Sequence, residues 1–203
     1  MVRANGGSDA FILGEVFDHE YYQLGLSFSP ATILDLGANA GFTAVYFSRH
    51  YPDARIAAVE PIEDNLRILR HNTAANAPSV EIVAAAASIK DGSAFMELAK
   101  SDYGHKIFDG DSASRAKTVL VKVMTIPSML RHLAWDRIGL LKMDIEGHEK
   151  ILFSGDCEWL RAVDAMCIEC HDGFGEPDLL GLAKQFGFLP PRRLPGIWLL
   201  VRA

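Results

Sequence analysis

Cysteine is scarce in this chain, which has three in 203 residues. The odd number does not suggest a disulfide framework, so a small disulfide-stabilised secreted domain is excluded. Cys167 and Cys170 form a C-x-x-C pattern, but the surrounding apolar run is typical of a β-strand, in which residues three apart face opposite sides. We therefore expect buried, reduced thiols rather than a shared metal site, and a cytoplasmic location.

Long hydrophobic runs and concentrated basic charge are also absent. No apolar run approaches the roughly 20 residues that a membrane-spanning helix requires. The start of the chain, up to Asp9, is polar and glycine-rich, with no hydrophobic signal core. The 20 Lys and Arg are scattered, and 26 Asp and Glu leave a net charge of −6. Because nucleic acids bind concentrated basic faces, we expect neither a nucleic acid nor a membrane as partner. No pattern predicts an oligomeric state.

Apolar strands alternate with helices along most of the chain. Central strands are predicted at 33–36, 55–59, 80–87, 138–143 and 165–168, followed by a closing hairpin between 188 and 201. This alternation indicates an α/β, Rossmann-like fold: a mainly parallel seven-stranded sheet with one antiparallel strand and helices on both faces. One strand must be antiparallel because the hairpin is too short for a parallel crossover. At this length we expect a single domain over residues 1–203.

Two segments lie outside this alternation. Residues 1–30 are predicted to form a partly helical extension that packs on the core; the alternative, that its tyrosines and Glu15 fold over a ligand, stays open. Residues 101–117 are polar and lack periodicity, and they lie between short strands predicted at 94–98 and 119–124. We expect them to form a long surface loop.

The first strand runs into a glycine turn, Gly37 to Gly41, that opens a helix. Such a turn brings a nucleotide-like ligand close to bare backbone at a helix N-terminus. A dinucleotide fingerprint would need glycine at 39 and 42, where this chain has Asn39 and Phe42. Glu60 follows the turn by about 20 residues, the position from which a carboxylate accepts the ribose hydroxyls. These features favour an adenosyl ligand without a pyrophosphate.

Three stretches resemble the FkbM family of S-adenosylmethionine-dependent methyltransferases. They are Asp-Leu-Gly-Ala-Asn-Ala-Gly-Phe from Asp35, Val-Glu-Pro ending at Pro61, and Leu-Lys-Met-Asp-Ile-Glu-Gly-His-Glu ending at Glu149. The resemblance implies a class I methyltransferase that uses S-adenosyl-L-methionine, with the turn around the methionine part and Glu60 on the ribose. It also implies O-methylation of a hydroxylated small molecule, such as a sugar or secondary metabolite. The implied cofactor-binding residues are Asp35, Gly37, Ala38, Asn39, Gly41, Glu60, Pro61 and Ala87.

Acidic groups and histidines follow the later strands, at the sheet edge where ligands bind. A hydroxyl acceptor needs a base, and the Asp-Pro-Pro-Tyr type motif of N-methyltransferases is absent, which favours an oxygen acceptor. The candidate catalytic residues are Asp144, Glu146, His148 and His171. A divalent metal on Asp144, Glu169 and His171 is a second option, although we do not expect a metal.

Two rival functions stay open. A nicotinamide-dependent oxidoreductase uses a similar sheet, but Asn39 and the lack of a Tyr-x-x-x-Lys pair disfavour it. A protein that binds S-adenosylmethionine without catalysis would tolerate Asp144→Ala and Glu146→Ala.

Overall fold

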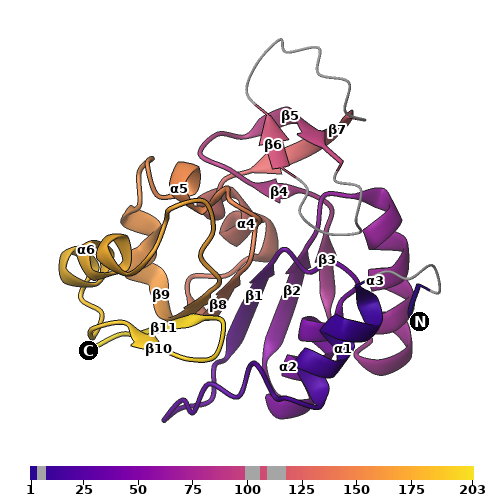
Figure 1. The fold of residues 1–203 in the computed structure, drawn as a ribbon, viewed down its shortest axis with the longest axis horizontal. Coiled ribbons are helices and arrows are strands. Elements are labelled where there is room, and N and C mark those ends of the chain that lie inside the picture. The colour runs from indigo at the N-terminus through magenta and orange to yellow at the C-terminus, as the bar shows by residue number, and fades with distance from the viewer. Residues whose placement is uncertain (4–7, 99–105, 109–117) are drawn as a thin grey trace.

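Seven strands form the main sheet of the structure, a computed structural model that describes residues 1–3, 8–98, 106–108 and 118–203 (Figure 1). Their order is β10-β11-β9-β8-β1-β2-β3. The strands are β1 Thr32–Leu36, β2 Arg55–Val59, β3 Glu81–Val83, β8 Ile138–Met143, β9 Val163–Ile168, β10 Arg192–Arg193 and β11 Trp198–Val201. In this order the neighbouring strands from β9 through β8, β1 and β2 to β3 pair parallel to one another. Strand β11 is antiparallel to both of its neighbours, β10 and β9. The predicted mainly parallel sheet with one antiparallel strand is therefore confirmed.

A second sheet of four strands, which the sequence did not predict, lies at the top of Figure 1. Its order is β4 Ala86–Ala87, β7 Thr118–Met124, β5 Gly92–Glu97 and β6 Lys106–Phe108. The strand predicted at 80–87 is wrong as a single element, since β3 pairs with β2 and β4 pairs with β7. The chain turns between them, where the amide of Ala85 donates to the carbonyl of Val83. Residues 82–87 are apolar on both sides of this turn, so the composition of the run gave no sign of the break.

The surface loop predicted at 101–117 is wrong for residues 106–108. These three residues form β6, which pairs antiparallel with β5. The remaining residues of the predicted loop lie outside the described ranges.

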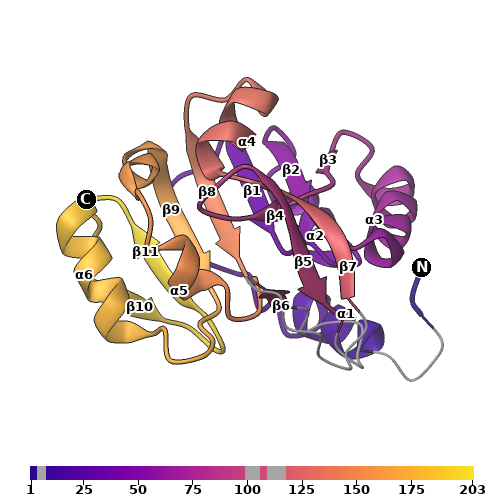
Figure 2. The ribbon, with the colours of Figure 1, turned by 90° about the horizontal axis from the view of Figure 1, so that it is seen from above.

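Helices cover both faces of the main sheet, as predicted. They are α1 Asp9–Phe17, α2 Phe42–His50, α3 Glu63–Asn76, α4 Ile126–Leu133, α5 Glu149–Leu152 and α6 Glu176–Phe186, with a 3₁₀ helix at Glu158–Ala162. Strand β1 alternates between the two cores: Ile33 packs with α2 and α3, whereas Leu34 and Leu36 pack with α4 and α6. Figure 2 shows α4 and α1 on opposite sides of the sheet. The candidate site lies at the carboxyl ends of β1, β2, β8 and β9, beside α1.

The N-terminal extension packs on the α2 side of the sheet. Val16, Tyr22 and Leu24 are buried there, and the ring of Tyr22 meets that of Phe47 edge to face, 5.6 Å between centroids. The extension therefore fixes α1 beside the ends of β1 and β2.

Three smaller observations concern Pro61, the thiols and membrane spans. Pro61 precedes α3, whose N-cap is Ile62. Cys157 and Cys167 are buried and Cys170 partly so; all three are free thiols. Among the described residues, no helix has both the length and the apolarity to cross a membrane.

Candidate active site

One cavity of about 480 Å³ opens at the carboxyl ends of β1, β2, β8 and β9. Its volume lies in the range of small-molecule and cofactor sites, and its place is the one where open α/β sheets bind ligands. Six of the expected cofactor residues line it: Gly37, Ala38, Asn39, Glu60, Pro61 and Ala87. The four candidate catalytic residues, Asp144, Glu146, His148 and His171, line the same cavity. The sequence motifs thus meet around one space.

Asp35 and Gly41 differ from the other expected cofactor residues, because neither is among the residues that line the cavity. Asp35 is completely buried beneath the turn, where its Oδ1 lies 3.1 Å from Nζ of Lys142. Gly41 is the N-cap of α2, in a left-handed conformation with φ +83°, and a Cβ there would meet the side chain of Leu69. Both residues therefore lie beneath the turn, outside the lining of the cavity.

Lys142 supports the glycine turn from the neighbouring strand. Strands β1 and β8 place it directly beside Asp35, and its Nζ also donates to the carbonyl of Gly37 at 2.8 Å. Burial alone would disfavour the ammonium, but the Asp35 and Asp144 carboxylates raise the pKa of Lys142 above its usual value. The residue is therefore a buried cation that holds the turn and faces two carboxylates.

The turn and the end of β8 touch through their backbones. A Cβ added to Gly37 would lie 1.8 Å from the carbonyl oxygen of Asp144, and Gly37 has φ +76°. Only glycine allows this approach. The close contact places Asp144 beside the cofactor turn.

Glu60 is buried at the floor of the cavity and is held by three donors. Its Oε2 accepts from the amide of Asn39 at 3.0 Å. Its Oε1 accepts from the amide of Ile62 at 2.9 Å and from Nδ2 of Asn65 at 3.3 Å. Burial raises the pKa of Glu60 more than these donors lower it. Asn39 has φ +46°, a left-handed conformation that turns its amide toward Glu60.

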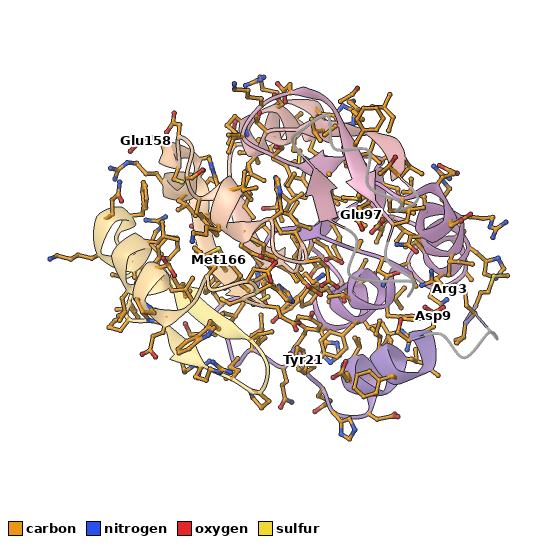
Figure 3. The ribbon with its side chains drawn as sticks, turned by 45° about the horizontal axis from the view of Figure 1, so that its top comes forward. Arg3, Asp9, Tyr21, Glu97, Glu158 and Met166 are labelled. Carbon is orange, nitrogen blue, oxygen red and sulfur yellow. The ribbon has the colours of Figure 1, made fainter. Side chains whose placement is uncertain are left out.

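The N-terminal extension forms a further wall of the cavity. Glu15, Tyr21 and Tyr22 line it, together with residues of the first turns of α1. Tyr21, labelled in Figure 3, packs against the hairpin turn, where a Cβ on Gly196 would lie 1.6 Å from its hydroxyl oxygen. Both interpretations of the extension therefore have structural support: it packs on the core through Tyr22, and its residues reach the ligand space.

His171 lies within a ring of carboxylates at the other end of the cavity. Its Nδ1 is 3.1 Å from Oε1 of the fully buried Glu149, which also accepts from the amide of Ile145. Its Nε2 is 3.9 Å from an oxygen of Asp144, 3.9 Å from Glu146 and 3.7 Å from Glu169.

These carboxylates change the proton affinity of the histidine and of Asp144. Hydrogen bonding to Glu149, and then to Glu169, raises the pKa of His171 to about 10. The ordinary imidazole pKa of 6.5 therefore does not apply to His171 in this environment, and the ring is protonated at neutral pH. Burial, reinforced by Glu169 and Glu146, raises the pKa of Asp144 to about 7 although Lys142 opposes the shift. A group with a pKa near neutrality is well matched to accept a proton.

His148 is buried and lines the cavity, with Nε2 3.5 Å from the hydroxyl of Ser88. It lies on the second-sheet side of the site, whereas His171 lies between the ends of β8 and β9. The structure thus brings all four candidate residues to one cavity but gives the two histidines different surroundings.

Sequence reasoning missed Lys142, Asn65, Arg3 and Asp9. A signal existed for Lys142: strands 33–36 and 138–143 each carry a single charge of opposite sign within apolar neighbours. Asn65 lies five residues after Glu60, within the next helix, but nothing marked it. No local pattern linked Arg3 to the turn, because its partners Asn39 and Asn65 are distant in sequence. Asp9 accepts hydrogen bonds from Arg3, which connects it to the turn.

The strand order and the cavity at the strand ends define a Rossmann-like class I methyltransferase fold. The FkbM methyltransferase from Methylobacillus flagellatus KT has a similar structure, with a TM-score of 0.59 and 18% identity; the match covers 89% of this chain and 46% of that one. A family described as "Methyltransferase FkbM domain" matches residues 35–189. The chain belongs to this family.

Two curated relatives share this part of the sequence. The chain is 26% identical over 210 residues to the methyltransferase sdnD of Sordaria araneosa, covering 88% of this chain and 81% of sdnD. It is 25% identical over 222 residues to the AMB antimetabolite synthetase AmbE of Pseudomonas aeruginosa. That match covers 88% of this chain but only 10% of AmbE, so the chain spans a small part of that protein's length.

Proposed function

We propose that this chain is an S-adenosylmethionine-dependent methyltransferase that methylates a hydroxyl oxygen of a small molecule. The observation that carries the proposal is that one cavity joins Glu60 and the glycine turn to the carboxylates that follow β8 and β9. A donor site and a proton-accepting site therefore share one space.

The donor half is suited to an adenosyl amino acid. Glu60 keeps acceptor capacity for ribose hydroxyls, because its Oε2 receives one described hydrogen bond, from Asn39. Ala86 and Ala87 supply an apolar wall for an adenine, and the backbone of Gly37 to Asn39 faces the remaining part of the cofactor. This arrangement points the methyl group toward the end of the cavity that contains Asp144.

The acceptor half supplies a base. When bound, S-adenosylmethionine would supply an electrophilic methyl group to the hydroxyl oxygen and would leave as a neutral thioether. The hydroxyl proton leaves to the Asp144 carboxylate, whose pKa of about 7 leaves a large fraction ready to accept it at neutral pH. The pre-aligned contact of Asp144 with Gly37 keeps base and donor together.

A direct test is methyl transfer to a panel of hydroxylated metabolites, read as a product mass increase of one methylene unit. Asp144→Asn should lower turnover by roughly 10²–10⁴-fold and leave binding of S-adenosylhomocysteine within a few-fold. Asp53→Asn, an exposed residue of the loop between α2 and β2, is the matched control and should retain full turnover. Full turnover by Asp144→Asn would contradict the assignment of the base.

Measurements on the wild-type protein separate the two rival functions. A non-catalytic binding protein would bind the cofactor and give no product with any acceptor in the panel. A nicotinamide oxidoreductase would be stabilised against heat by NAD and not by S-adenosylhomocysteine.

A divalent cation would offer another way to activate the hydroxyl. One ligand atom each from Asp144, Glu169 and His171 lies within 4.8 Å of the others, which meets the distance requirement for a shared ion. Glu149 on Nδ1 would orient the imidazole, as carboxylates do behind metal-bound histidines. Turnover measured with and without a chelator decides the matter: unchanged turnover means that Asp144 acts without an ion.

A further inference from the structure

Arg3 lies far from the cofactor motifs in sequence, yet it contacts the residues that surround Glu60. Its Nη2 donates to Oδ1 of Asn39 at 3.0 Å, and its Nη1 donates to Oδ1 of Asn65 at 2.7 Å. Asn39 belongs to the glycine turn and Asn65 to α3. One guanidinium therefore connects the two elements that hold the Glu60 carboxylate.

Asp9 holds this guanidinium in place. It is the first residue of α1, and its side chain is fully buried while that of Arg3 is 14% exposed. Nε of Arg3 donates to both carboxylate oxygens of Asp9 at 3.0 Å, and Nη2 donates to Oδ1 at 2.5 Å. The backbone amide of Arg3 adds a hydrogen bond to Oδ2 at 2.8 Å. Figure 3 shows the two labelled residues side by side, next to α1.

The hydrogen-bond chemistry of the two asparagines makes this arrangement directional. Arginine has donors only, so it can bind an amide only through the oxygen. With Oδ1 of Asn65 on Arg3, the Nδ2 group must face Oε1 of Glu60, where it lies at 3.3 Å. With Oδ1 of Asn39 on Arg3, the left-handed turn that aims the Asn39 amide at Oε2 is supported from outside.

We propose that Arg3, fixed by Asp9, is a positioning residue of the cofactor site that sets the Glu60 carboxylate for the ribose through Asn39 and Asn65. The inference rests on the proposed function, because it assumes that Glu60 binds the ribose of S-adenosylmethionine. It makes the N-terminal segment part of cofactor recognition, although the family motifs begin only at residue 35.

The test is the affinity for S-adenosylhomocysteine, measured by calorimetry, in a cycle of variants. Arg3→Met should weaken binding about 10–50-fold in the wild-type background, with KM for S-adenosylmethionine raised and kcat changed less than threefold. In the Glu60→Gln background the same change should weaken binding less than about threefold, since its route to the ligand is already lost. Equal losses in both backgrounds, or no loss in either, would overturn the inference.

Two controls keep the result interpretable. Arg70→Met removes an exposed arginine on α3 that pairs with Glu63, and it should leave the affinity unchanged. Arg3→Lys keeps the charge beside Asp9, so it should fold even if Arg3→Met does not. A single ammonium cannot serve Asp9 and both amides at once, so Arg3→Lys should still bind at least fivefold more weakly; wild-type affinity for it would overturn the inference. If the wild-type protein itself does not bind S-adenosylhomocysteine, the proposed function fails first.

Discussion

The α-carbon of Gly37 packs directly against the carbonyl oxygen of Asp144, with space for a hydrogen and none for a methyl group. This contact joins the end of β1 to the end of β8, and therefore the proposed donor half of the cavity to its acceptor half. The relative position of the two halves thus depends on the absence of a Cβ at Gly37.

Gly37→Ala should separate these two strand ends. The new Cβ would lie 1.8 Å from a backbone oxygen that cannot rotate away, and alanine disfavours φ +76°. We expect a loss of roughly 2–5 kcal/mol in the free energy of unfolding and no measurable cofactor binding. Chemical denaturation and calorimetry measure the two effects.

The matched control for that change is Gly181→Ala within α6, where an added Cβ meets nothing within 4 Å. It should be neutral or stabilise the protein by up to about 1 kcal/mol. Similar stabilities for the two variants would show that the approach of Gly37 to Asp144 is looser than described.

Lys142→Met should destabilise the protein strongly, because it leaves Asp35 buried without a cation. Removing one partner of a buried pair costs about 3–5 kcal/mol, and here the Gly37 carbonyl also loses a donor. The double variant Asp35→Leu/Lys142→Met should recover at least half of the loss in chemical denaturation. Arg70→Met, which breaks an exposed pair, should cost less than about 1 kcal/mol. A double variant less stable than Lys142→Met would contradict the pairing.

Cofactor affinity should fall in acid, because the proposed role of Glu60 in accepting the ribose hydroxyls requires its charged form. Burial raises its pKa above 4.5, so the loss begins at a higher pH than for an exposed glutamate. Without ligand the sign is opposite: a folded-state pKa above the unfolded value means that this group adds stability as pH falls through the raised pKa. Calorimetry from pH 8 downward should show weakening that Glu60→Gln lacks, with apo melting curves reporting any acid unfolding. Parallel pH curves for both proteins would exclude Glu60 as the titrating group.

Gly196→Ala should displace Tyr21 from the cavity wall. The added Cβ would lie 1.6 Å from the hydroxyl oxygen and 2.4 Å from Cζ of that ring. We expect a raised KM for the acceptor, with binding of S-adenosylhomocysteine changed less than twofold. Tyr21→Ala removes the clash. In that background Gly196→Ala should lower the free energy of unfolding only by the backbone strain at φ +72°, about 1 kcal/mol. An unchanged KM would show that Tyr21 does not contact the acceptor.

Most of the main sheet was predictable because each central strand is a short apolar run that ends at a charged residue or a turn. The run at 80–87 was misassigned because its apolar residues continue through the bend at Ala85, so nothing in the sequence marks the bend. The second sheet was not expected because its strands β4 and β6 are two and three residues long. Their pairing depends on contacts distant in sequence.

The site was predictable where the chemistry follows a strand end, as for Glu60, Asp144 and His171. Asp35 was expected at the cofactor because its motif position was known, whereas its side chain points to Lys142. Sequence position does not reveal on which side of a turn a side chain lies. The pKa of His171 also depends on carboxylates from several segments, which only the fold assembles.

The central claim is that the cavity at the strand ends binds an adenosyl amino acid and presents its methyl group to an acceptor. The most direct measurement is a thermal-shift and calorimetric comparison of S-adenosylmethionine, S-adenosylhomocysteine and NAD on the wild-type protein and on Glu60→Gln. We predict that both adenosyl ligands stabilise the wild-type protein, that Glu60→Gln binds them at least tenfold more weakly, and that NAD has no effect. Stabilisation by NAD alone would contradict the account.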